Sequence, residues 1–90
     1  MIDWSQVVTV KDQIHHRAKV LRANRDAILA SSMWIVERHR GQVELAGETS
    51  ITHHQYKELL SYHQTLRDLP SQPGWPDIEI PSAPTWLAAI

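Results

Sequence analysis

The sequence predicts a mainly α protein: two helices packed as an antiparallel pair, an irregular connection between them, and an extended C-terminal tail. Two observations support this fold class. Apolar residues recur at three- and four-residue spacing in two segments, which is the helical period. All 5 prolines lie within residues 70–90, where they exclude a regular helix. We therefore expect a helical domain over residues 1–69 and a Pro/Trp-rich tail over residues 70–90.

The first helix is expected over about residues 10–31. Its apolar stripe is defined by Ile14, Leu21 and Ile28, which recur every seven residues. Thr9 is the expected N-cap, because its hydroxyl can accept a hydrogen bond from a backbone N–H of the first turn. A serine pair follows the last apolar residues, and we expect the helix to fade there.

The segment that follows, residues 33–51, is predicted to be an irregular connection. Gly41 and Gly47 interrupt it. Trp34 and Val36 fit either a short strand or a ragged helical turn, and the sequence leaves both alternatives open.

The second helix is expected over about residues 53–68. Thr52 and Gln55 form a capping box at its start, and Pro70 stops it. Its apolar stripe consists of Tyr56, Leu59, Leu60, His63 and Leu66. Because His63 lies on this stripe, we expect a core or interface histidine with one hydrogen bond.

Two interpretations apply to the C-terminal tail, and both can hold. Trp75 and Trp86 can fold back and cap the helical pair, with prolines reducing the entropy lost on ordering. Alternatively, the stiff apolar segment docks on another protein, since tryptophan is a preferred residue at the centre of interfaces. The segment "DIEI", residues 77–80, also fits a short edge strand. The predicted partner-binding residues are Tyr62, Pro73, Trp75, Pro76, Trp86 and Leu87.

The composition argues against several classes of function, among them membrane proteins and secreted disulfide-bonded proteins. The net charge is -1, so no overall field attracts nucleic acid or a membrane surface. There is no cysteine, which excludes disulfides and thiolate metal sites. No stretch approaches the roughly 20 apolar residues that span a bilayer. The first 13 residues contain an early acid and do not resemble a secretion signal. We expect a soluble, cytoplasmic protein.

Motifs for catalysis or cofactor binding are missing from the sequence. Phosphate-binding glycine motifs and a nucleophile elbow are absent, so we expect no enzyme and no cofactor. The 6 histidines contain no pair at helical i, i+4 spacing, so we expect no metal site. The first helix carries five cationic residues against two acidic ones. A small regulatory nucleic-acid-binding protein that uses this basic face therefore remains an alternative.

Three segments resemble one known family. "LLSYHQTLRDLP", Leu59–Pro70, is similar to a tyrosine-led helix that ends in L-R-D-x-P. "QPGWPDIEIP", Gln72–Pro81, is similar to a Q-P-G-aromatic-P stretch followed by an apolar strand and a proline. "ERHRGQVE", Glu37–Glu44, resembles a segment that precedes the helix in some members. Together they resemble the phage tail assembly chaperone family, small proteins that accompany tail-fibre genes in tailed phages and prophages. Two positions depart from that pattern: His63 stands where arginine is common, and Ile80 where tryptophan is more frequent.

The resemblance implies assistance in assembly without catalysis. It implies that the protein binds a phage tail or tail-fibre component stoichiometrically, in the cytoplasm of the bacterial host, and it supplies no catalytic residues. A minor structural tail component remains a further alternative. The sequence also leaves open a homo-oligomer and does not name the tail protein.

Overall fold

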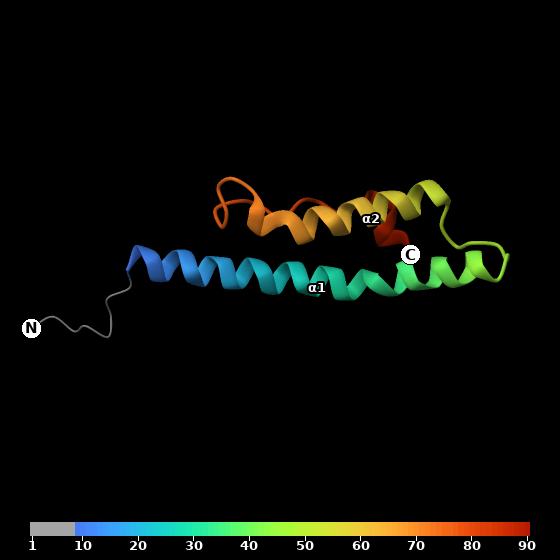
Figure 1. Cartoon of the computed structure of the whole chain (residues 1–90), viewed down its shortest axis with the longest axis horizontal. Helices are drawn as coiled ribbons and strands as arrows, with labels where there is room; N and C mark the ends of the chain where they lie inside the picture. Colours follow the sequence, from blue (N-terminus) through green and yellow to red (C-terminus); the bar gives the residue numbers. More distant parts are fainter. Residues whose placement is uncertain (1–8) are drawn as a thin grey trace, which may run out of the picture.

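The computed structural model describes residues 9–90, which form two antiparallel α-helices and a C-terminal segment folded back along them (Figure 1). Helix α1 spans Val10–Glu44 and helix α2 spans His53–Asp68. Two short 3-10 helices follow, η2 at Leu69–Ser71 and η3 at Thr85–Ala89. The mainly α fold class is therefore confirmed, and residues 9–90 contain no strand. Residues 1–8, which hold most of the segment assessed for a secretion signal, lie outside the described part.

Helix α1 begins where the sequence predicts. The Thr9 hydroxyl accepts a hydrogen bond from the Asp12 backbone N–H at 3.0 Å. The Asp12 carboxylate accepts one from the Thr9 N–H at 3.4 Å, so the capping box is complete with aspartate in place of glutamate.

The prediction that the first helix ends near its serine pair is wrong, because α1 continues to Glu44. The hydroxyls of Ser31 and Ser32 both donate to the Ile28 carbonyl at 2.9 Å. Serine disfavours helix when its hydroxyl competes for backbone groups in other conformations. Here both hydroxyls are satisfied inside the helix, so the pair does not terminate it.

Helix α1 continues through the segment predicted as an irregular connection because side chains of that segment are buried. Ile35 and Val36 are almost fully buried and belong to the core between the helices. His39 continues the same face one turn later and is also buried. Burying these side chains outweighs the cost of roughly 1 kcal/mol for Gly41 inside a helix. Of the two alternatives for Trp34 and Val36, the short strand is wrong, because both residues lie in α1.

A left-handed residue ends α1. Ala46 has a φ of 55°, and its N–H donates to the Val43 carbonyl at 3.0 Å. The N–H of Gly47 donates to the Gln42 carbonyl, also at 3.0 Å. This pair of bonds is the Schellman arrangement, which satisfies carbonyls left over at a helix end. Alanine occupies the position where glycine is usual, so this end of the helix has no clear signal in the sequence.

Helix α2 has the bounds that the sequence predicts. Thr52 and Gln55 exchange two hydrogen bonds, at 2.9 and 3.0 Å. Leu59 and Leu66 have no exposed surface and form the centre of the core. The buried apolar residues are Ile35, Val36, Ile51, Leu59, Tyr62, Leu66 and Leu69.

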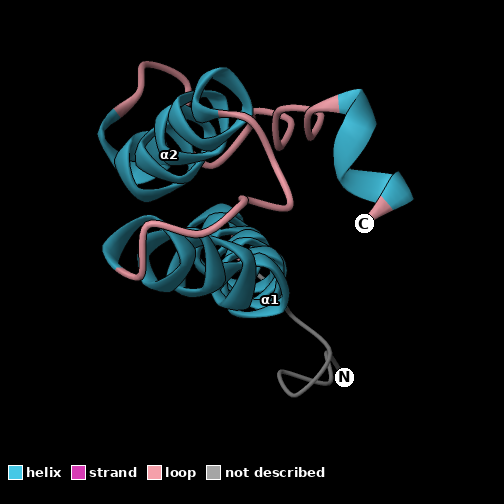
Figure 2. Ribbon diagram, turned by 90° about the vertical axis from the view of Figure 1, so that its right-hand side faces the viewer, coloured by secondary structure: helices cyan, strands magenta, loops and turns pink. Residues whose placement is uncertain are grey.

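Residues 72–90, called the strap from here on, return along the helical pair. Ile78, Ile80, Trp86 and Leu87 pack against the core. Seen along the helices, η3 lies beside the α1–α2 pair and does not extend away from it (Figure 2). The strap is thus an ordered part of the fold, and "DIEI" forms no strand. That residues 1–69 form a separate domain stays a prediction.

Candidate functional site

The first part of the strap is fixed to α1 by two arginines. Arg17 Nη1 donates to Asp77 Oδ1 at 2.7 Å, and both side chains are more than half exposed. The Arg22 guanidinium lies 5.6 Å from the centre of the Trp75 ring. Such exposed contacts contribute little individually, but they orient the turn that carries Trp75.

The second part of the strap is fixed to α2 by two hydrogen bonds. The Tyr62 hydroxyl donates to the Pro81 carbonyl at 2.9 Å. Burial of this phenol raises its pKa above the ordinary value of 10.0, so it remains a donor at neutral pH. The Trp86 indole N–H donates to Glu58 Oε1 at 2.6 Å. The helices therefore position both strap tryptophans, as one of the two interpretations expected.

The six predicted partner-binding residues differ in exposure. Tyr62 and Pro76 are buried, with the Trp75–Pro76 peptide in the cis form. Pro73 is exposed, whereas Trp75, Trp86 and Leu87 are half-buried. Only these four retain surface toward solvent in this conformation. That the six residues contact a partner stays a prediction.

The sequence does not predict an apolar surface that lies next to η3. Trp34 on α1 is 45% exposed, and so is Ile90 at the end of the chain. With Leu87 they line a shallow cavity of about 210 Å³ between α1 and η3. The Arg38 guanidinium lies 4.9 Å from the centre of the Trp34 ring. Because the sequence predicts an irregular connection around Trp34, it gives no reason to expect this residue next to the strap. We call Trp34, Leu87 and Ile90, together with Trp86, the neighbour of Leu87 in η3, the apolar surface.

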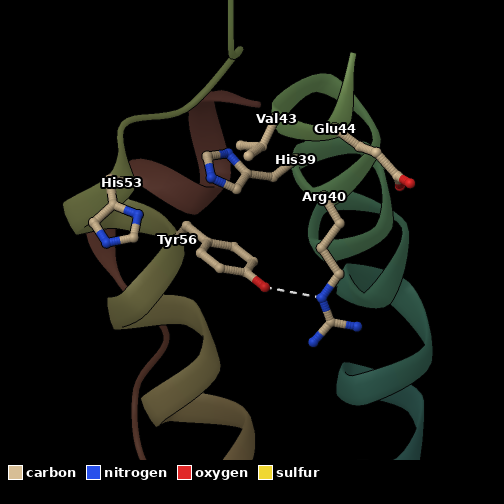
Figure 3. Close-up of a pocket in the computed structure, with 6 residues that line it drawn as sticks. All are labelled: His39, Arg40, Val43, Glu44, His53 and Tyr56. Atoms are coloured by element: carbon tan, nitrogen blue, oxygen red, sulfur yellow. Dashed lines mark hydrogen bonds between the residues drawn. The ribbon is translucent and has the colours of Figure 1, made fainter. Parts of the chain in front are cut away.

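A second cavity, of about 230 Å³, lies between the end of α1 and the start of α2 (Figure 3). It is lined by His39, Arg40, Val43, Glu44, His53 and Tyr56. The His39 ring stacks on the Tyr56 ring, with centroids 4.3 Å apart. Arg40 Nε donates to the Tyr56 hydroxyl at 2.9 Å. The sequence signal for this site was the segment "ERHRGQVE", which supplies four of the lining residues.

Three of the five cationic residues on the basic face of α1 make contacts within the protein. Arg17 and Arg25 form ion pairs, with Asp77 and Asp26 respectively. Arg22 lies over Trp75, as described above. A nucleic-acid interface needs cationic groups that are available for phosphates. The structure therefore offers little support for the nucleic-acid alternative.

The described part of the chain contains neither clustered metal ligands nor a helix suited to a membrane. Within residues 9–90, no cluster of three or more potential metal ligands is present. None of the helices described is both long and apolar enough to cross a membrane. His63, a further candidate from the sequence, is buried and hydrogen-bonded to Ser32 at 2.7 Å, which confirms the expected core histidine.

Comparison with known proteins identifies one family. A family model described as phage tail assembly chaperone protein matches residues 18–85, about three quarters of the 90-residue chain. The matched region includes α2, most of α1 and the strap as far as Thr85. Searches of curated proteins and of solved structures found no significant match.

Proposed function

The chain belongs to the phage tail assembly chaperone family, and from this premise we propose that it binds one tail or tail-fibre protein stoichiometrically during assembly. The proposed contact consists of the apolar surface and, nearer the start of the strap, Trp75 and Pro73. Binding takes place in the cytoplasm of the bacterial host and needs neither a cofactor nor catalysis.

The exposure of Trp34 is the observation that carries this proposal. Trp34 is nearly half exposed, although tryptophan is usually well covered in a folded protein. It lines the same cavity as Ile90, which is equally exposed, and two serines also line that cavity. Exposed apolar side chains that lie together mark protein interaction sites, and tryptophan contributes more binding energy than most residues at interfaces.

The anchored strap supports the same proposal. Ordering a flexible segment on binding costs affinity, and a segment that is already ordered avoids that cost. Tyr62 and Glu58 hold the strap in place through their bonds to Pro81 and Trp86. In this proposal the buried Tyr62 and Pro76 support the strap without touching the partner. The half-buried Trp75, Trp86 and Leu87 contact the partner.

The proposal is tested by affinity capture. The chain, tagged at its N-terminus, is expressed with the late genes of its phage or prophage, and the co-purified proteins are identified. We expect one tail or tail-fibre protein, with recovery reduced at least about tenfold by Trp34→Ala or Trp86→Ala. Each variant is first checked for helical content and cooperative unfolding. His15→Ala, at an exposed position on α1, is the matched control and should leave recovery unchanged.

Two results would contradict the proposal. One is recovery of the same tail protein by folded tryptophan variants at the wild-type level, which would exclude the apolar surface. The other is recovery of nuclease-sensitive nucleic acid without a tail protein, which would favour the nucleic-acid alternative. Presence of the chain in purified virions would instead indicate a retained tail component.

A further inference from the structure

We propose that the cavity between the end of α1 and the start of α2 binds a peptide segment of a partner protein in which an aromatic residue stands next to a carboxylate residue. We call it the α1–α2 cavity. That the partner is the tail protein rests on the proposed function, whereas the peptide chemistry rests on the cavity alone.

The size of the cavity favours a single side chain. Its volume is about 230 Å³. Sites for small molecules and cofactors usually enclose ≈ 300–1,000 Å³. The α1–α2 cavity is smaller than this range, so one large side chain of a peptide fits it better than a free metabolite.

Ring surfaces make up much of the lining. The His39 and Tyr56 rings are stacked, and the His53 ring lies 6.4 Å from that of Tyr56. Val43, 57% exposed, adds an aliphatic edge. Aromatic side chains prefer offset or edge-to-face contacts with other rings, at centroid distances of about 4.5–7 Å. This lining favours an aromatic residue in the cavity.

His39 points to a ligand independently of shape. Its side chain is 3% exposed, and Nδ1 has no hydrogen-bond partner among the described residues. Leaving a buried polar atom unpaired costs about 1–3 kcal/mol, and native proteins rarely contain such atoms without a reason. The ring projects from α1 into the space beside His53 and Tyr56 (Figure 3). Because Nδ1 has almost no accessible surface in this conformation, a polar group of a bound peptide offsets that cost if the surrounding side chains move on binding.

The charge at the mouth of the cavity favours an acid. Arg40 uses Nε for Tyr56, and within residues 9–90 no carboxylate forms an ion pair with it. Glu44, four residues after Arg40, also lines the cavity, but its carboxylate points away from the rings (Figure 3). Guanidinium groups bind carboxylates with two parallel hydrogen bonds. The start of α2 favours an anion and the end of α1 disfavours one, so the two helix dipoles oppose each other here and the preference for an acid rests on Arg40.

The test uses capped hexapeptides of otherwise glycine and serine, titrated into the isotopically labelled full chain and followed by amide chemical shifts. The probe contains phenylalanine followed by glutamate. One control peptide replaces the glutamate with glutamine, and another replaces the phenylalanine with alanine. We expect saturable shifts in residues 39–44 and 53–56, with at least about tenfold weaker binding of either control peptide.

Two variants locate the contact. Arg40→Gln should reduce affinity for the phenylalanine–glutamate peptide to that of the glutamine control. Arg38→Gln is the matched control, because its guanidinium lies over Trp34, outside the cavity. Val43→Trp, at an exposed position that can fill the cavity without disturbing the core, should abolish the shifts.

Three results would overturn the inference: no saturable shift with the phenylalanine–glutamate peptide, equal affinity for the glutamine control, or shifts confined to the strap. Its failure can be distinguished from failure of the proposed function. If capture depends on Trp34 and Trp86 but no peptide binds, the inference about the cavity is refuted and the proposed function stands. If the peptide binds but no tail protein is captured, the proposed function is refuted and the inference about the cavity stands.

Discussion

Ser32 Oγ and His63 Nε2 lie 2.7 Å apart in the interior and join α1 to α2. The Ser32 hydroxyl donates its single proton to the Ile28 carbonyl at 2.9 Å. His63 Nε2 must then carry a proton and donate it to Oγ. This assigns the neutral Nε2–H tautomer and leaves Nδ1 as a buried acceptor without a partner among the described residues. This contact is a buried polar link between the helices, in addition to the exposed bond from Arg40 to Tyr56.

Replacing Ser32 with alanine should destabilise the protein by about 1–3 kcal/mol, because it leaves the buried Nε2–H of His63 without an acceptor. The measurement is chemical denaturation followed by circular dichroism. Ser31→Ala is a matched control, since Ser31 makes the same bond to Ile28 but is exposed. We expect that control to change the free energy of unfolding by less than about 0.5 kcal/mol. Equal effects of the two substitutions would contradict the role of the contact.

Stability should fall in mild acid because of His63. Burial, and then the positive charge of Arg67, lower the pKa of His63 below its ordinary value of 6.5. The unfolded chain therefore binds the proton more readily than the folded chain. The stabilisation is present above about pH 6.5 and is lost as pH falls from there toward the depressed folded-state pKa.

Denaturation at about pH 7.5 and about pH 5.5 checks the sign. The free energy of unfolding should be lower at the acidic pH, and His63→Gln should remove part of that difference. A variant whose pH dependence equals that of the wild type would show that another group is responsible.

Ala46→Gly should stabilise the protein, although glycine normally weakens helices. Ala46 has a φ of 55°, a conformation that glycine adopts without steric cost. We expect a gain of roughly 0.5–1 kcal/mol in the free energy of unfolding. Ala30→Gly, the same substitution at an exposed position within α1, should cost about 1 kcal/mol. Loss of stability in both variants would argue against the left-handed end of α1.

Tyr62→Phe should loosen the strap. It removes the bond to the Pro81 carbonyl, which contributes about 0.5–1.5 kcal/mol. Hydrogen exchange of backbone amides in residues 77–90 should accelerate, while exchange in the centre of α2 changes less. Tyr56→Phe is the control, because its hydroxyl contacts Arg40 and not the strap. Unchanged exchange in the strap of the Tyr62 variant would show that other contacts suffice to hold it.

The sequence was most informative where structure depends on local signals. The start of each helix follows from a capping threonine, and Pro70 ends α2 through sterics that involve only its neighbours. The second half of α1 was missed because local signals and burial disagree there. Ser31 and Gly41 predict an end of the helix, but the helix continues because Ile35 and its neighbours are buried against α2. Such tertiary burial is not visible in a single segment.

The site could be predicted only in part for a similar reason. The strap tryptophans stand out by composition, and the structure fixes both of them to the helices. Their anchors, however, join residues as distant as Trp86 and Glu58, and no spacing rule relates such pairs. Trp34 became part of the apolar surface only because η3 returns to α1 beside it. The α1–α2 cavity likewise depends on how two helix ends meet.

The proposal that the chain binds one tail protein stoichiometrically is tested most directly by native mass spectrometry of the complex purified after co-expression. We predict a single species with a fixed integer ratio of this chain to one tail or tail-fibre protein. Folded Trp34→Ala and Trp86→Ala variants should yield the free chain instead. Finding the wild-type chain alone, or a continuous distribution of ratios with several unrelated proteins, would contradict stoichiometric binding through the apolar surface.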